Sequence, residues 1–214
     1  MTDGYGTAMT VTADDLDQAV QLAVAKLREA STADWEGKAG TLDWTCWETG
    51  EHLSDAVLSY AVTLGPKIPP LDGDVPFQVG KLRADGPESG IHADRTAGPT
   101  GLAQMIEACG GLLVAMVRTT PPETPAYHGN GTTNPEGFAA MGVVETLVHT
   151  HDITEGLGLD WTPPAELCAT SLARMFPDAP AGTDPWPTLL WATGRGELPG
   201  HDRLVKWRWE PTPR

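Results

Sequence analysis

Glu145, His149 and Asp152 are the residues whose types and spacing indicate chemistry. They lie in the segment Met141–Asp152, which reads MGVVETLVHTHD. If the segment is helical, residues three and four positions apart share a face, so the three side chains fall on one stripe. Burying a carboxylate and an imidazole there costs several kcal/mol unless the groups are paired. Two interpretations follow: the residues bind a divalent metal, or Glu145 and His149 hydrogen-bond each other at a helix edge.

His52 is a further candidate ligand, at the margin of the apolar stripe of another predicted helix. It either points inward or is a half-exposed histidine with no task. His92 lies in a polar, glycine-flanked stretch and is predicted to be a loop residue. Since the chain has no C-x-x-C pair, any metal site must be built from histidines and carboxylates.

Four amphipathic segments must position these residues. Apolar side chains recur in them every three to four positions, over approximately residues 12–30, 47–64, 102–117 and 134–156. Thr12 with Asp15 matches a capping box, and Asn134 followed by Pro135 begins the fourth segment. One short connection and two long ones, 65–99 and 119–133, join the segments. The sequence therefore predicts an all-α four-helix bundle with long crossover loops, and such bundles place metal ligands on facing helices.

Two glycines interrupt the third segment. Gly110 and Gly111 each cost about 1 kcal/mol relative to alanine in a helix interior. Their presence predicts that a neighbouring helix approaches closely there.

The chain is expected to divide into the bundle, residues 1–157, and a C-terminal extension, residues 158–214, packed on it. The extension should contain short elements at residues 162–176, 186–193 and 203–209. The first two are predicted to be helical, and the third alternates like a strand or an extended tail. Lys206 and Arg208 project together from this tail, either as a solvated face or as an anion-binding site.

Composition limits the partners. The chain has 214 residues and a formal net charge of −15, which argues against binding nucleic acid or an anionic membrane surface. No apolar run is expected to cross a membrane, and the first ten residues do not resemble a signal peptide. Three widely spaced cysteines, Cys46, Cys109 and Cys168, fit reduced thiols in the cytoplasm better than a disulfide framework.

Two motifs resemble a known family. Trp44-Thr45, with His52-Leu53 eight residues after the tryptophan, is similar to the W-T-x(6)-H-L signature of DinB-like bundles. Glu145-x-x-x-His149-x-x-Asp152 is similar to the E-x-x-x-H-x-x-D motif on their fourth helix. The order and spacing agree over about residues 10–157. Within that superfamily the chain most resembles the mycothiol-dependent maleylpyruvate isomerases.

The resemblance implies one divalent metal, usually zinc, held by His52, Glu145 and His149. Asp152 would orient a histidine, as metal-bound imidazoles generally require. Three protein ligands and one open position are typical of catalytic zinc. His151 faces away from His149 on an ideal helix and is excluded as a ligand. Bundles of this kind often pair through helices, so a homodimer is a further expectation.

The function implied is a metal-dependent enzyme that activates a low-molecular-weight thiol, mycothiol, for attack on a small electrophilic substrate. His52, Glu145, His149 and Asp152 would be its catalytic residues, and the two long loops are candidates for the pocket walls. The reaction would be S-transfer or isomerisation. Because the tail is shorter than the C-terminal domain of the isomerases, isomerisation of maleylpyruvate itself is not predicted. The alternatives are a metal-activated hydrolase with Asp152 as base, and a non-enzymatic protein that sequesters a small molecule.

Overall fold

The computed structural model describes residues 10–214, which form helices and connecting segments without a β-strand in that range. The elements are α1 (Ala13–Arg28), α2 (Cys46–Thr63), a short 3₁₀ helix η1 (Arg95–Ala97), α3 (Gly98–Thr119), α4 (Pro135–Leu157), α5 (Ala165–Met175) and α6 (Pro185–Ala192). The all-α class predicted from the sequence is confirmed. The stretch predicted as a strand or extended tail, residues 203–209, forms no strand and bends at Val205 and Lys206.

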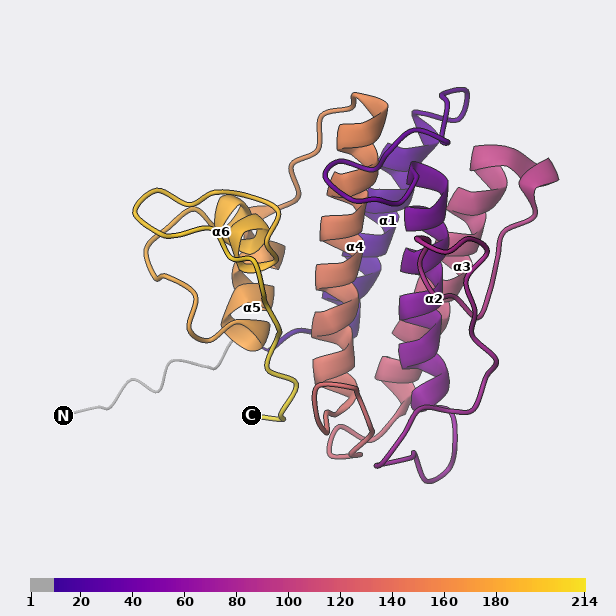
Figure 1. The fold of residues 1–214 in the computed structure, drawn as a ribbon. Helices are drawn as coiled ribbons and strands as arrows, with labels where there is room; N and C mark the ends of the chain where they lie inside the picture. The colour runs from indigo at the N-terminus through magenta and orange to yellow at the C-terminus, as the bar shows by residue number, and fades with distance from the viewer. Residues whose placement is uncertain (1–9) are drawn as a thin grey trace.

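Helices α1 to α4 form the DinB-like four-helix bundle. Both α1 and α2 pack against α3 and against α4. Figure 1 shows the segment between α2 and α3 running back along the bundle, so that these two helices are parallel. As a result α2 and α4, which carry the candidate site residues, lie against each other.

Side-chain caps mark the beginning of three of the four bundle helices, α1, α2 and α4. The Thr12 hydroxyl accepts a hydrogen bond from the Asp15 amide, and the Asp15 carboxylate accepts one from the Thr12 amide. Asn134 accepts from the Gly137 amide and begins α4 in the same way. Such caps stabilise a helix by about 1 kcal/mol each. A second capping box, formed by Thr45 and Glu48, begins α2 one residue before the predicted start and was missed in the sequence.

Helix α4 is buried on nearly all sides, which is why its polar residues lie in the core. Helices α1 and α2 cover part of it, and α5 covers another face. Figure 1 shows α5 and α6 beside α4, outside the four-helix bundle. The proposed division of the chain at residue 157 remains a prediction.

Arg174 holds the C-terminal tail against α5. Its side chain is buried, forms an ion pair with Glu136 at 2.6 Å and donates hydrogen bonds to the carbonyls of Glu210 and Pro211. The Glu210 amide donates to the carbonyl of Met175. These contacts join residues 210 and 211 of the tail to the C-terminal end of α5.

The two mid-helix glycines differ in their surroundings. A Cβ at Gly110 would lie 2.7 Å from the Val20 side chain of α1, so this glycine permits the predicted close approach. A Cβ at Gly111 would meet nothing within 4 Å, and the prediction was wrong for that residue.

One helical stretch, Arg95–Thr119, is long and apolar enough to cross a membrane by length and composition alone, contrary to the expectation from the sequence. Core helices of soluble proteins pass the same test, and this stretch packs on α1 and α2 with Leu102, Ile106 and Leu113 fully buried.

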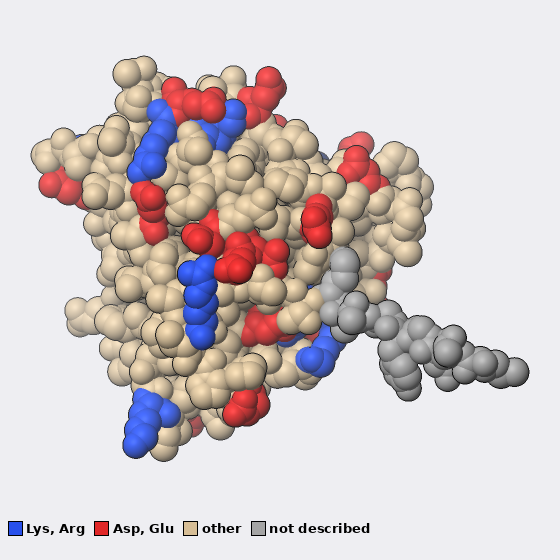
Figure 2. Space-filling view, turned by 180° about the vertical axis from the view of Figure 1, so that it is seen from behind, with Lys and Arg blue, Asp and Glu red and all other residues tan. Residues whose placement is uncertain are grey.

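On the face shown in Figure 2, basic side chains are few and separated, and most lie beside acidic ones.

Candidate metal centre

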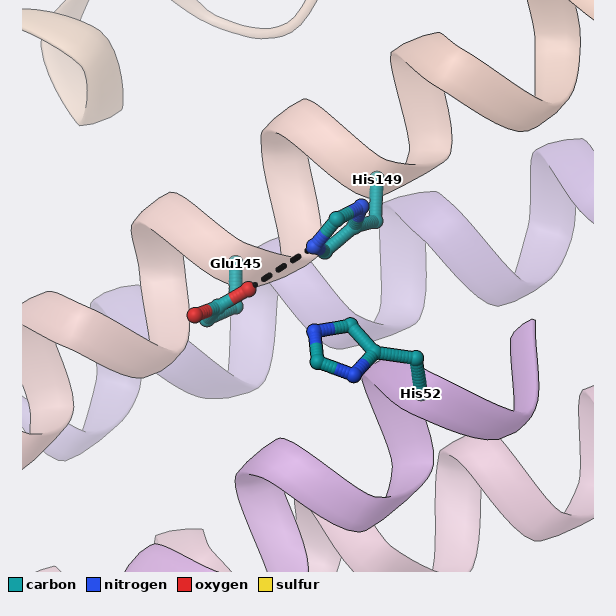
Figure 3. A group of neighbouring side chains, drawn as sticks. All are labelled: His52, Glu145 and His149. Carbon is teal, nitrogen blue, oxygen red and sulfur yellow. Dashed lines mark ion pairs between the residues drawn. The ribbon is translucent and has the colours of Figure 1, made fainter. Parts of the chain in front are cut away.

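His52 of α2 and Glu145 and His149 of α4 converge at one point of the bundle. One potential ligand atom from each residue lies within 4.8 Å of the other two, and within residues 10–214 this is the only such group found. Figure 3 shows the three side chains pointing toward one another. Two imidazole nitrogens and one carboxylate oxygen form a donor set that suits zinc. The structure therefore brings together the three side chains named from the sequence, and their role as metal ligands stays a prediction.

Glu145 is the anionic member of the group. Burial alone would raise the pKa of Glu145, but the hydrogen bond and charge of His149, helped by His52 and Arg195, hold it well below its usual value. The Glu145 carboxylate also accepts a hydrogen bond from the Tyr60 hydroxyl at 3.2 Å. Glu145 is therefore ionised at neutral pH and fixed in orientation from α2.

His149 is held between two carboxylates. Its Nε2 lies 3.0 Å from Oε2 of Glu145, and its Nδ1 lies 3.0 Å from Oδ2 of Asp152. Although burial lowers the pKa of His149, the hydrogen bonds that its ring donates to Asp152 and Glu145 raise this pKa above its ordinary value. The contact between Asp152 and Nδ1 leaves Nε2 as the nitrogen that faces the site. Asp152 thus has the orienting position that the sequence resemblance implied.

Arg195 completes this chain of contacts and was missed by the sequence analysis. Its Nε lies 3.0 Å from both carboxylate oxygens of Asp152, and its Nη2 lies 2.8 Å from Oδ2. Burial would raise the pKa of Asp152, but His149 and Arg195 lower it. Arg195 follows α6 in the turn at Gly194, whose φ is +73°. A cation between two glycines was the only signal in the sequence, and it is too weak to place Arg195 against a residue of α4.

His52 contributes a neutral imidazole. Burial, with a smaller effect from the charge of His149, lowers the pKa of His52 to about 4. Figure 3 shows its Nε2 turned toward Glu145 and His149. Its Nδ1 is buried and has no hydrogen-bond partner among residues 10–214. The ring of Trp44 lies beside it, with centroids 4.8 Å apart. A neutral ring with one nitrogen facing the site fits a metal ligand, and no residue in the described part of the chain supplies the partner that the other nitrogen of such a ring usually has.

A cavity of about 400 Å³ opens on this group. Its walls come from residues 41–44 and from the C-terminal segment that includes Arg195, Leu204, Trp207 and Trp209. The predicted walls, residues 65–99 and 119–133, do not line it. Residues 74–91 instead line a separate cavity of about 360 Å³ against the outer side of α2. The prediction was wrong because the extension folds back over α4 and occupies the place expected for the loops.

Two further histidines, His92 and His151, lie outside the donor group. Nδ1 of His92 lies 3.3 Å from the buried carboxylate of Glu51. This carboxylate also accepts a hydrogen bond from the Ala93 amide, so Glu51 holds the crossover segment against α2. His151 packs edge-on against Trp186 and is not part of the donor group, as predicted.

Comparison with known proteins gives a match over the bundle. A family model described as "Mycothiol maleylpyruvate isomerase N-terminal domain" matches residues 14–154, which contain the three donor residues and Asp152 but not Arg195. No curated protein and no solved structure was found to match the chain.

Proposed function

The chain belongs to the mycothiol maleylpyruvate isomerase N-terminal domain family, and from this membership we propose that it is a metal-dependent enzyme using a low-molecular-weight thiol, mycothiol. Its second substrate would be a small electrophilic organic molecule. The observation that carries the proposal is the convergence of His52, Glu145 and His149 at the floor of a cavity.

The metal would be held by those three side chains. Zinc, when bound, lowers the pKa of a thiol that occupies its open position. Glu145 supplies one negative charge, His52 is already neutral, and Asp152 fixes the ring of His149. Arg195 keeps Asp152 ionised and in place. The indole rings of Trp44, Trp207 and Trp209 line the cavity, where they limit the access of water.

The nucleophile would be the external thiol, because the protein's own cysteines are unsuited to this role. Burial raises the pKa of Cys46 and Cys109 to about 11 and that of Cys168 to about 12. None of the three lines the metal cavity. The thiol would lose its proton, and its sulfur would bond to an electrophilic carbon of the substrate. The new bond would either displace a leaving group, such as chloride, or form by addition across a C=C bond. Retention of the resulting thioether corresponds to S-transfer, whereas rotation about the new single bond followed by expulsion of the thiolate restores the C=C bond and corresponds to isomerisation.

The geometry gives less support to the hydrolase alternative. That reaction needs a general base within reach of water. Asp152 is almost fully buried, and both of its oxygens contact Arg195. We also propose a cytoplasmic location, in keeping with three free, buried cysteines and a reduced thiol as cosubstrate.

Thiol dependence tests this function. We expect the zinc-loaded protein to consume a model electrophile, such as monochlorobimane, only when mycothiol is present, and faster than the uncatalysed reaction. Turnover of an ester substrate without any thiol would contradict the proposal and favour a hydrolase. Tight binding of a small molecule that survives removal of the metal, without turnover, would favour a sequestering protein.

A further inference from the structure

A third cavity lies in the C-terminal extension, outside the residues that match the family. Its volume is about 610 Å³, within the range of roughly 300–1,000 Å³ that is usual for small-molecule sites. It shares Leu204, Trp207 and Trp209 with the metal cavity, so the two spaces adjoin at these side chains. A ligand long enough to extend past these three side chains would occupy both.

Indole rings dominate the lining. Trp191, Trp207 and Trp209 all contribute, and the rings of Trp207 and Trp209 lie 5.5 Å apart at 62° to each other. Trp207 is 39% exposed, although tryptophan side chains are usually more deeply buried. The buried Nε1 of Trp209 has no hydrogen-bond partner among residues 10–214, whereas a buried indole N–H normally has one. The cavity therefore offers apolar indole faces, and one indole beside it has an N–H group without a partner in the described residues.

The charges around the cavity balance. Lys206 and Arg208 contribute two positive charges, and Asp178 and Glu210 contribute two negative ones. A site for a dicarboxylate would show a surplus of cations, and this one does not. Flat indole faces combined with both acidic and basic hydrogen-bonding groups suit a neutral polyhydroxylated ligand, because sugar C–H faces stack on indoles and hydroxyls both donate and accept.

We propose that this cavity binds the sugar part of the thiol cosubstrate. The identity of the ligand rests on the proposed function: mycothiol carries its thiol on an acetylcysteine arm attached to a glucosamine–inositol disaccharide. The disaccharide would lie between the indoles of the extension, and the arm would pass Trp207 and Trp209 to reach the metal cavity. The extension thus recognises the thiol, while the bundle supplies the ligands for the metal.

The test uses the thiol-free disaccharide, N-acetylglucosaminyl-inositol, titrated calorimetrically into the full chain with and without a metal chelator. We expect binding in both conditions, at least tenfold weaker binding in Trp207→Ala and in Asp178→Asn, and little change between 50 and 300 mM salt. Two matched controls should bind like the wild type: Phe77→Ala, which removes an exposed aromatic ring of the crossover segment, and Asp160→Asn, which neutralises an exposed aspartate between α4 and α5.

No binding of the disaccharide, or equal binding by the wild type and Trp207→Ala, would overturn the inference even if thiol-dependent activity is found. Binding of maleate in place of the disaccharide, lost in Lys206→Ala and weakened by salt, would overturn it in favour of an anion site. Because the probe carries no thiol and needs no metal, its Trp207-dependent binding would establish the site even if the protein proved to have no thiol-dependent activity.

Discussion

Asp152 of α4 is held by Arg195 of the C-terminal extension, with contacts of 2.8 to 3.0 Å to both carboxylate oxygens. Asp152 in turn contacts Nδ1 of His149 at 3.0 Å. The extension therefore supports a candidate metal ligand through one intermediate residue, although the family match ends before Arg195.

Replacing Arg195 by alanine should weaken the metal site and the fold together. The variant leaves the buried Asp152 carboxylate without its cation, which costs about 3 kcal/mol of unfolding free energy. Loss of a residue that orients a ligand lowers metal affinity by about 10- to 100-fold. Denaturant unfolding and chelator competition measure the two effects.

The control for Arg195→Ala is Arg203→Ala, because Arg203 is exposed and only reaches the Gly194 carbonyl at 3.5 Å. The Arg203→Ala variant should change neither the free energy of unfolding nor the metal affinity. Equal metal affinity in the wild type and in Arg195→Ala would show that the contact with Asp152 does not support the site.

Metal binding should release about one proton at pH 6. His149 has a raised pKa and faces a carboxylate at each ring nitrogen, so it is protonated there and must lose the Nε2 proton to bind a metal. His52, with a pKa of about 4, is already neutral and releases none. The affinity for the metal should therefore fall as the pH drops below the pKa of His149. His52 should take up a proton only near pH 4.

Calorimetric titration of zinc in two buffers of different ionisation enthalpy counts these protons. His151→Ala should give the same count as the wild type, since His151 is not a donor. Release of two protons at pH 6 would mean that His52 is also charged, which would contradict its neutral state at that pH.

Gly110 and Gly111 form an internal pair for testing the packing of α3 on α1. Gly110→Ala should destabilise the protein by about 1–3 kcal/mol, because the new methyl group would press on Val20. Gly111→Ala adds a methyl group in open space and should stabilise the helix by up to about 1 kcal/mol. The denaturant midpoints of unfolding of the two variants measure these effects. Equal shifts of the midpoint in the same direction would contradict the packing of α3 on α1.

The cysteines should react slowly in the native protein. With a pKa of about 11 for Cys46 and Cys109, the thiolate fraction at pH 8 is about one in a thousand. A thiol-reactive dye should label the folded chain far more slowly than the chain in denaturant. Fast labelling of any one cysteine under native conditions would identify a reactive thiol and weaken the case for an external nucleophile.

The sequence was sufficient for the parts of the fold that depend on local patterns. Apolar periodicity and the caps at Thr12 and Asn134 located the bundle helices, and the spacing of Glu145, His149 and Asp152 placed them on one face. The path of the extension could not be predicted, because it depends on long-range contacts such as those of Arg174 with the tail. For the same reason Arg195 and the walls of the metal cavity were missed.

The most direct test is the metal content of the purified protein, measured by elemental analysis for the wild type and for His52→Ala and His151→Ala. We expect about one zinc per chain in the wild type and in His151→Ala, and none in His52→Ala, with circular dichroism showing that all three are folded. No metal in the wild type after growth and purification with zinc, or full retention in His52→Ala, would contradict a metal centre formed by His52, Glu145 and His149.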